Sequence, residues 1–210
     1  MPHQSDKLYL IPTEFERQKV QAILADRFPE QASRFQFQLC GFGPIAAAAK
    51  TMQLLVEQPA NVVLLGIAGT YQTERFPVGS STKFNHVVCH GVGVGSGEQF
   101  VSASELGWQQ GEAVDDRIDC VGVSASELPR DLLTVCSAAD SPAEAAVRLA
   151  KNPTTVGEDM EAFGVAMACQ ISGVECEVIR GFSNVAGDRD KTNWQIDLAL
   201  AAAVELLIKT

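Results

Sequence analysis

Residues 61–70, read in one-letter code as NVVLLGIAGT, decide the fold of this 210-residue chain. After Asn61, the run Val-Val-Leu-Leu is apolar at every position, which is typical of a strand buried on both faces of a sheet. The glycines at 66 and 69 predict a turn directly after that strand. Because a sheet buried on both faces must be covered by helices, and such sheets are usually parallel, the stretch indicates an α/β protein.

Short β-rich runs alternate with helical ones on both sides of this stretch. Further strands are predicted at residues 8–11, 35–39, 133–137 and 177–180, and helices at residues 14–25, 45–57, 142–150, 159–171 and at the end of the chain. The segment 77–128 is rich in Gly and Ser, and only 87–89 and 120–123 resemble strands there. We therefore expect a single three-layer domain, residues 1–210, with a central, mostly parallel (mixed) sheet flanked by helices.

Composition narrows the classes of function. With 46% hydrophobic and 20% charged residues the chain is an ordinary globular protein, and its net charge of −10 argues against binding nucleic acid through phosphates. Six scattered cysteines have no metal-ligand spacing and are interpreted as reduced core thiols. The first residues lack a secretory signal, and the late apolar run 198–208 is interrupted by Glu205 and too short to span a membrane. We expect a cytoplasmic protein that binds a small molecule, with no nucleic-acid or membrane partner.

Loops that follow strands are where ligands bind in such folds, and three of them carry unusual residues. The first, PTEFER, places Glu14 and Glu16 in the first turn of a helix, where acidic residues also simply favour the helix dipole. The second is GIAGT, and the third combines EDMEA at 158–162 with SNVAGDRDKTNW at 183–194. Another glycine-rich run, GVGVGSGE at 91–98, lacks the flanking strand and helix of a dinucleotide site and predicts a loop.

These motifs together resemble the nucleoside phosphorylase and nucleosidase superfamily. Its members combine a helix-opening D/E-M-E with a later strand that ends in S-D or S-N, which Asp159-Met160-Glu161 and Ser183-Asn184 match in type, order and separation. GFGPIAAAA at 41–49 and GIAGT resemble its two glycine turns. Within the superfamily, SNVAGDRDKTNW is most similar to the futalosine hydrolases, which remove hypoxanthine from a menaquinone precursor. The resemblance implies a nucleoside phosphorylase-like fold over nearly the whole chain.

The resemblance also implies roles for individual residues. Glu161 accepts hydrogen bonds from the ribose hydroxyls and Met160 packs against the sugar, which leaves Glu158 and Asp159 with a helix-start explanation. Glu16, or less favourably Glu14, orients the attacking water. The purine lies among four further residues, Ala68, Gly69, Ser183 and Asn184, under an aromatic cover from Trp194. Neither a metal nor an organic cofactor is needed, because these groups suffice to stabilise an oxocarbenium-like ribose and the departing base.

Asn184 points to the kind of base. Adenosine-type nucleosidases of the family have Asp here, whereas the amide NH2 of Asn can donate toward both N7 and O6 of a 6-oxopurine. The resulting expectation is an enzyme that hydrolyses futalosine to hypoxanthine and dehypoxanthine futalosine, and that forms a homodimer or higher homo-oligomer. Asn cannot protonate N7, so solvent would supply that proton.

Three alternatives stay open from the sequence. A purine nucleoside phosphorylase would need phosphate donors; the turns GFGP and GIAGT contain no Arg, Lys or Ser, but Arg17 and Arg75 lie near them in sequence. A methylthioadenosine/adenosylhomocysteine nucleosidase is disfavoured by Asn184. The third alternative is a nucleoside-binding protein without turnover. Ile67 departs from the family's G-S-A-G-G, so the 5′ pocket, and the choice among futalosine, aminofutalosine and a simple nucleoside, are not predicted.

Overall fold

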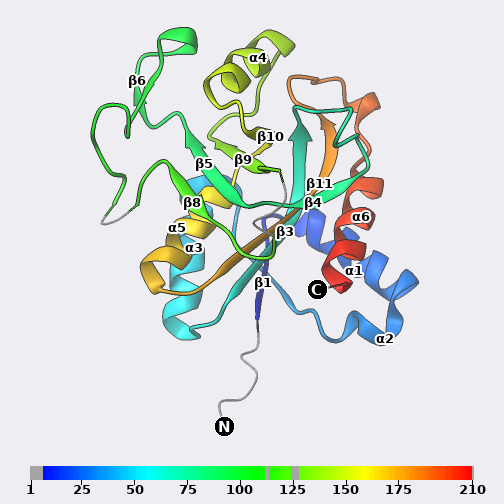
Figure 1. Cartoon of the computed structure of the whole chain (residues 1–210). Helices are drawn as coiled ribbons and strands as arrows, with labels where there is room; N and C mark the ends of the chain where they lie inside the picture. The colour runs from blue at the N-terminus through cyan, green and yellow to red at the C-terminus, as the bar shows by residue number, and fades with distance from the viewer. Residues whose placement is uncertain (1–6, 112–113, 124–127, 210) are drawn as a thin grey trace.

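The computed structural model describes residues 7–111, 114–123 and 128–209. Within these residues a nine-stranded mixed sheet lies between two layers of helices (Figure 1). The strands of this sheet are β1 (Leu8–Ile11), β2 (Phe37–Leu39), β3 (Val62–Thr70), β4 (Ser81–Lys83), β5 (His86–His90), β8 (Arg117–Asp119), β9 (Asp131–Val135), β10 (Thr155–Asp159) and β11 (Cys176–Val185). The helices are α1 (Glu14–Arg27), α2 (Pro29–Ala32), α3 (Pro44–Glu57), α4 (Pro142–Lys151), α5 (Ala162–Ser172) and α6 (Ile196–Ile208).

Strand β3 is the centre of the sheet. Its first residues pair in parallel with β1, its last two pair antiparallel with β10, and β11 runs parallel to it along its whole length. Strands β2, β9 and β5 continue the sheet in parallel, whereas β4 and β8 add antiparallel pairs. A separate two-stranded ribbon pairs β6 (Gly93–Val94), which lies in the glycine-rich run that was expected to be a loop, with β7 (Val101–Ser102) just after that run.

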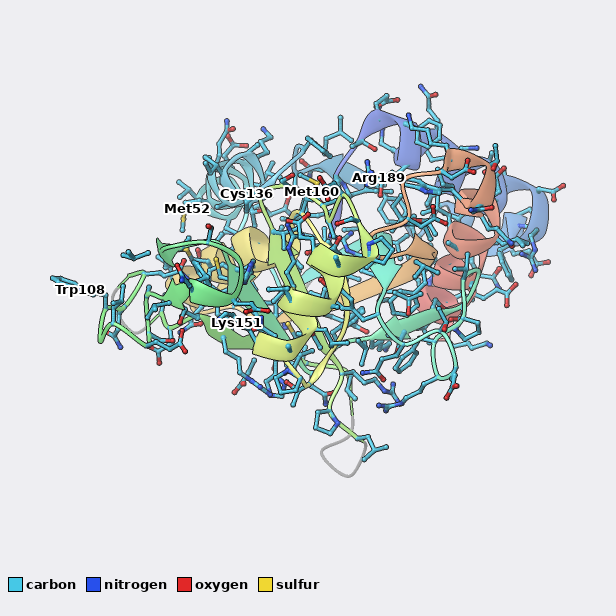
Figure 2. The ribbon with its side chains drawn as sticks, turned by 90° about the horizontal axis from the view of Figure 1, so that it is seen from above. Met52, Trp108, Cys136, Lys151, Met160 and Arg189 are labelled. Carbon is cyan, nitrogen blue, oxygen red and sulfur yellow. The ribbon has the colours of Figure 1, made fainter. Side chains whose placement is uncertain are left out.

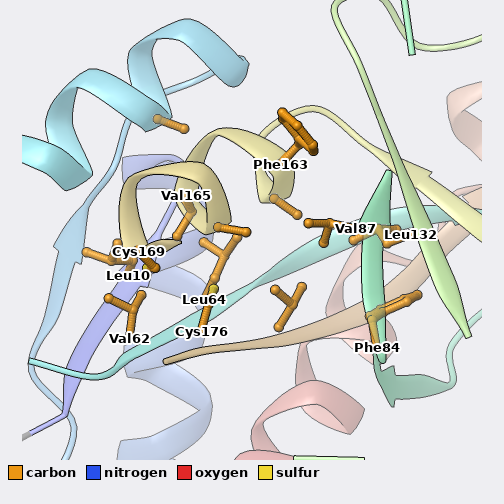
Figure 3. Close-up of a cluster of buried hydrophobic side chains, with 14 of the residues drawn as sticks. Leu10, Val62, Leu64, Phe84, Val87, Leu132, Phe163, Val165, Cys169 and Cys176 are labelled. Atoms are coloured by element: carbon orange, nitrogen blue, oxygen red, sulfur yellow. The ribbon is translucent and has the colours of Figure 1, made fainter. Parts of the chain in front are cut away.

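The core has two sides because successive strand residues point to opposite faces of the sheet. Val62 and Leu64 of β3 face one layer, where they join α3 and α5 in a cluster that also contains Leu10 and Cys176 (Figure 3). Val63 and Leu65 face the other layer, which α1 and α6 cover. The apolar run at 62–65 is therefore buried on both faces, and the predicted layered α/β fold is confirmed.

Several element boundaries differ from the sequence prediction. The glycine turn predicted at 66–69 is wrong: β3 continues to Thr70 because each residue from Val62 to Thr70 is paired in register with a residue of β11, whose one bulge lies between Phe182 and Asn184. Likewise β11 continues to Val185. The strand predicted at 120–123 lies earlier, as β8, where it pairs with β5.

The most consequential difference concerns EDMEA. Glu158 and Asp159 end a buried strand, β10, and helix α5 begins only at Ala162. The prediction that 158 and 159 open a helix is therefore wrong. The apolar residues that follow Glu161 predict the helix correctly. The five residues of β10 form a strand because they pair with β9 and β3, which lie far away in the sequence.

All six cysteines are free thiols, as predicted, but they are not all in the core: Cys40, Cys169 and Cys176 are buried, and Cys136 is exposed. No helix among residues 7–111, 114–123 and 128–209 has the length and apolar character that crossing a membrane requires.

Candidate active site

One cavity of about 410 Å³ brings together the ends of β1, β3, β10 and β11. Its lining includes every residue selected from the sequence, namely Glu16, Ala68, Gly69, Met160, Glu161, Ser183, Asn184 and Trp194. Seen from above, Met160 and Arg189 lie near each other on this side of the molecule (Figure 2). The alternative residue Glu14 instead lies at the surface, where it pairs with Arg17 at 2.6 Å and with Gln18. Between the two acidic candidates, the geometry favours Glu16.

Glu16 is fixed at the start of α1 by its neighbours on two elements. Thr13 caps the helix by accepting the backbone N–H of Glu16 at 3.2 Å, and its hydroxyl donates to Glu16 Oε2 at 2.6 Å. Glu16 Oε1 accepts the backbone N–H of Ile67 on β3 at 3.2 Å. The residue thus contributes to helix capping, and the same contacts aim an almost buried carboxylate at the cavity.

Arg180 lies beneath the cavity and was given no role by the sequence reasoning. Its guanidinium, with 0% exposure, donates to Asp159 Oδ2 through Nη2 at 2.6 Å and Nε at 3.1 Å, and Nη2 lies 3.5 Å from Glu161 Oε2. Nη1 has no hydrogen-bond partner among the described residues and lies toward Glu16, because a Cβ on Gly66 would be 2.1 Å from Nη1 and 2.9 Å from Glu16 Oε1. The signal that could have found it is an arginine between the apolar residues Ile179 and Phe182, at the end of a predicted buried strand, since a buried charge requires carboxylate partners.

Asp159 and Glu158 have structural partners that explain their burial. Asp159 accepts Thr134 Oγ1 at 2.7 Å and, through Oδ2, the backbone N–H of Ala162 at 2.9 Å, so it supports the first turn of α5 from the end of β10. Glu158 accepts bonds from Tyr71 Oη at 2.6 Å, Arg148 Nη1 at 2.9 Å and the backbone N–H of Ala139 at 2.8 Å. The helix-start explanation therefore holds in part for Asp159 and fails for Glu158.

Glu161 is the N-cap residue of α5, and its side chain bridges two layers of the site. Oε1 accepts the backbone N–H of Gly43, at the start of α3, at 3.1 Å. Burial raises the pKa of Glu161 to about 7; the nearby Arg180 opposes this rise, whereas the charges of Asp159 and Glu16 add to it. The carboxyl group therefore titrates near neutral pH, which is typical of functional sites.

A β-bulge in β11 brings Ser183 and Asn184 to the same cavity. The pairing with β3 shifts between Phe182 and Asn184, so that two consecutive residues, which would point to opposite faces of a regular strand, both line the cavity. The hydroxyl of Ser183 donates to Asn184 Oδ1 at 2.8 Å, and Asn184 Nδ2 donates to the carbonyl of Val185 at 2.9 Å. With Oδ1 occupied, the amide presents its second N–H beside Gly69 as a donor.

The mouth of the cavity is aromatic. Phe15, Phe42 and Trp194 line it, and Phe15 and Phe42 are 53% and 66% exposed. Trp194 is held by its indole N–H, which donates to the carbonyl of Asp188 at 3.1 Å, and the Arg189 guanidinium lies 5.2 Å from the indole centroid. The site thus has a polar inner end and an aromatic entrance that also carries the Arg189 guanidinium.

Comparison with solved structures identifies the fold class. The chain matches methylthioadenosine/S-adenosylhomocysteine nucleosidases from Colwellia psychrerythraea, in complex with adenine (TM-score 0.73, 19% identity, 98% of this chain and 94% of that one), and from Neisseria meningitidis, in complex with methylthio-immucillin-A (0.74, 18%, 96% of each). It also matches the futalosine hydrolase of Helicobacter pylori (0.73, 15%, 98% and 97%). The chain therefore has the fold of these nucleosidases.

Sequence comparison gives a more particular relative. The chain is 29% identical to the futalosine hydrolase of Streptomyces coelicolor over 177 residues, which cover 80% of this chain and 75% of the relative. No protein-family model matches the chain. The predicted resemblance to the nucleosidase superfamily, and to futalosine hydrolases within it, is confirmed.

Proposed function

We propose that this protein is an N-glycosidic hydrolase that cleaves futalosine into hypoxanthine and dehypoxanthine futalosine, a step in menaquinone biosynthesis. The observation that carries the proposal is a single cavity in which Glu16, Glu161 and the donor amide of Asn184 converge. The similarity in sequence to a futalosine hydrolase supports the same assignment. No cofactor takes part in the proposed reaction.

The two carboxylates would act on the ribose and the water. Glu161 would accept the ribose hydroxyls, with Met160 against the sugar, and Glu16 would orient a water molecule toward the anomeric carbon. As the bond from that carbon to N9 breaks, its electron pair moves to the base, and positive charge develops on the ribose between two nearby carboxylates. The water oxygen then bonds to the carbon and loses a proton to Glu16. Arg180 would hold Glu161 in place through its Nη2, while its Nη1 lies toward Glu16.

Asn184 would stabilise the departing base. Its free N–H can donate to N7 or O6 of a 6-oxopurine, both of which are acceptors. The carbonyl of Val185 fixes the orientation of the amide, because a carbonyl oxygen only accepts and must therefore face Nδ2. The negative charge that reaches the base is met by hydrogen bonding, and solvent protonates the product. Ala68 and Gly69 would form the adjacent wall, and Trp194 the aromatic cover.

The positions of two arginines favour hydrolysis over phosphorolysis. Arg17 pairs with the surface residue Glu14, and Arg75 donates to the carbonyls of Leu128 and Pro129 and stacks on Phe76. Neither arginine is part of the cavity lining, so the two candidate phosphate ligands of the sequence lie elsewhere. The backbone N–H of Gly43, at the start of α3, is engaged by Glu161.

We further propose that the enzyme is cytoplasmic and assembles as a homodimer or higher homo-oligomer. The free state of all six cysteines fits a reducing compartment, and the expectation of assembly rests on resemblance to oligomeric relatives. Exposed apolar side chains on α3 and at its start, including Ile45 and Val56 at 81% and 76%, are compatible with assembly. Analytical ultracentrifugation at several protein concentrations would measure the oligomeric state.

The deciding experiment follows base release by chromatography from futalosine, inosine and methylthioadenosine, with and without phosphate. We expect hypoxanthine from futalosine at a rate that does not depend on phosphate. Cleavage of methylthioadenosine alone would instead assign the chain to the 6-amino nucleosidases, and phosphate-dependent release would indicate a phosphorylase. Tight nucleoside binding without base release would indicate a binding protein.

A further inference from the structure

The cavity mouth holds a positive charge that the proposed reaction does not use. Of the described residues that line this cavity, Arg189 is the only Lys or Arg. The lining also contains four acidic residues, but three of these pair with cations outside the lining: Glu158 with Arg148, and Asp159 and Glu161 with Arg180. Among the residues that the structure describes, Arg189 is thus the one cation in the cavity lining.

Arg189 is not engaged by its own loop. The carboxylate of Asp188 accepts the backbone N–H of Asp190 and the side-chain amide of Asn193, and the carboxylate of Asp190 accepts the backbone N–H of Thr192. The two carboxylates that flank Arg189 therefore bind groups of their own turn. Within the described residues, the guanidinium of Arg189 has no hydrogen bond or ion pair, and its contact is the face of Trp194. Stacking on an indole orients the planar guanidinium while leaving its N–H groups available to a carboxylate.

A groove continues from the mouth of the cavity. It has a volume of about 690 Å³ and shares Phe15, Trp194 and Ile196 with the cavity. Its two lysines differ: Lys19 is paired with Asp197, whereas Lys191 is exposed. A nucleoside seated with its base at Asn184 and its ribose at Glu161 therefore has room for a bulky substituent between aromatic walls.

We propose that Arg189, which lies over the ring of Trp194 in the cavity that Phe15 also lines, binds the carboxylate of an aromatic acid carried on the 5′ side of the nucleoside. This inference rests on the proposed function. Arg189 would select a nucleoside with a long anionic 5′ substituent over one with a short neutral substituent. A chain with a net charge of −10 repels anions in general, so an anionic substrate requires a local cation. The planar fork of Arg189 supplies paired donors for a carboxylate, and the rings of Phe15 and Trp194 pack against the aryl group.

The test compares substrates that differ only at the carboxylate. Futalosine, whose 5′ substituent is an aromatic acid, is compared with its methyl ester in wild type, Arg189→Gln and Arg189→Lys. We expect Arg189→Gln to raise KM for futalosine about 10- to 100-fold more than KM for the ester, because a charge-assisted hydrogen bond is lost. Arg189→Lys keeps the charge but loses the planar fork, and should give an intermediate ratio. Lys50→Gln, which removes one charge from the surface of α3, serves as the control.

Other outcomes would overturn the proposal. Equal losses on futalosine and its ester would mean that Arg189 contacts the purine or supports the loop, and a selective loss in Lys191→Gln would place the carboxylate farther along the groove. Calorimetry would measure the Kd of futalosine for Glu161→Gln, with and without Arg189→Gln, and so would test carboxylate binding in the absence of turnover. If wild type cleaves methylthioadenosine and not futalosine, the proposed function is wrong. If wild type cleaves futalosine but Arg189→Gln affects futalosine and its ester equally, only the role of Arg189 is wrong.

Discussion

Glu161 occupies a position where its function and its stability conflict. The side chain is 5% exposed and next to Asp159 and Glu16, which makes its negative charge costly despite Arg180. An ionised carboxylate is nevertheless what an oxocarbenium-like ribose requires. A pKa of about 7 means that the free protein at neutral pH holds a mixture of both forms.

The conflict predicts opposite effects of Glu161→Gln on turnover and on stability. Between about pH 4.5 and 7, Glu161 is protonated in the folded protein but ionised in the unfolded chain. The free energy of unfolding therefore falls as the pH rises through this window. We therefore expect Glu161→Gln to be more stable than wild type by on the order of 1–3 kcal/mol at pH 8, and about equal at pH 4.5. Urea unfolding at the two pH values measures this difference. A variant that is less stable than wild type at pH 8 would contradict it.

The same titration predicts the pH dependence of activity. Because the proposed mechanism uses the ionised form of Glu161, kcat/KM for the wild type should rise through about pH 7 and level off above it. Glu161→Gln should lose turnover by about 100-fold or more, since it removes a charge that stabilises the transition state. Steady-state base release between pH 5 and 9 tests both statements, and a flat wild-type profile would contradict the assignment.

Asn184 allows a test of base selection. In Asn184→Asp, a carboxyl group that shares a proton can accept from N6 of adenine and donate to N7, which suits 6-aminopurines. We expect the ratio of kcat/KM for an adenosine-type substrate over its inosine counterpart to rise about 10-fold or more, a difference worth about 1.4 kcal/mol. Competition between the two nucleosides, followed by chromatography, measures the ratio directly. An unchanged ratio would mean that Asn184 does not determine which base is preferred.

The strands around the cavity depend on a bulge and on glycines. The bulge in β11 lets Ser183 and Asn184 both line the cavity. The absence of a side chain at Gly66 on β3 leaves room for the Arg180 guanidinium. Strand β10 shows the same dependence at Gly157, where a Cβ would lie 2.6 Å from the carbonyl oxygen of Gly69. The end of the sheet that carries the cavity is thus built by close approach of its backbones.

Gly66→Ala tests this dependence on close approach. The new methyl group would lie 2.1 Å from Arg180 Nη1, in a region where both Arg180 and Glu16 are held by hydrogen bonds. We expect a loss of about 1–3 kcal/mol in the free energy of unfolding together with a lower kcat, because Arg180 must move away from Glu16. Gly173→Asn, at a helix end with no neighbour within 4 Å, is the matched control and should change stability by less than about 1 kcal/mol. Full activity in Gly66→Ala would show that the position of Arg180 is not needed.

The sheet as a unit divides the core into two sides that meet at β3. Leu64 packs with the α3 and α5 layer and Leu65 with the α1 and α6 layer, and both are fully buried. Stability should therefore depend on both layers to a similar degree.

Leu64→Ala and Leu65→Ala should each destabilise the protein by about 2–5 kcal/mol, because each leaves a cavity in a closely packed layer. Leu198→Ala on α6, where the side chain is 59% exposed, should cost about 0.5 kcal/mol or less. Urea unfolding monitored by circular dichroism measures all three variants. If only one of the two buried leucines matters, the two-sided description of the core is wrong.

Much of the site could be predicted because short motifs carry the resemblance to nucleosidases, and because loops after strands meet at one end of such a sheet. Glu16, Glu161, Ser183 and Asn184 were all placed in one site from the sequence, and they line one cavity. What could not be predicted depends on partners distant in sequence. Arg180 acquires a role only when β10 brings Asp159 and Glu161 beside it.

The sequence by itself determined the layered α/β architecture, the residues that end near the cavity and the resemblance to nucleosidases, because each follows from local periodicity or a contiguous motif. Residues 61–65 were correctly recognised as a buried strand, but the GIAGT that follows was expected to turn. Only the tertiary structure decided that it continues as strand, that EDMEA straddles a strand and a helix, and that Arg189 faces the cavity mouth. The physical reason is that glycine-rich backbone has no strong preference of its own, so hydrogen bonds from β11 and β10 set its conformation.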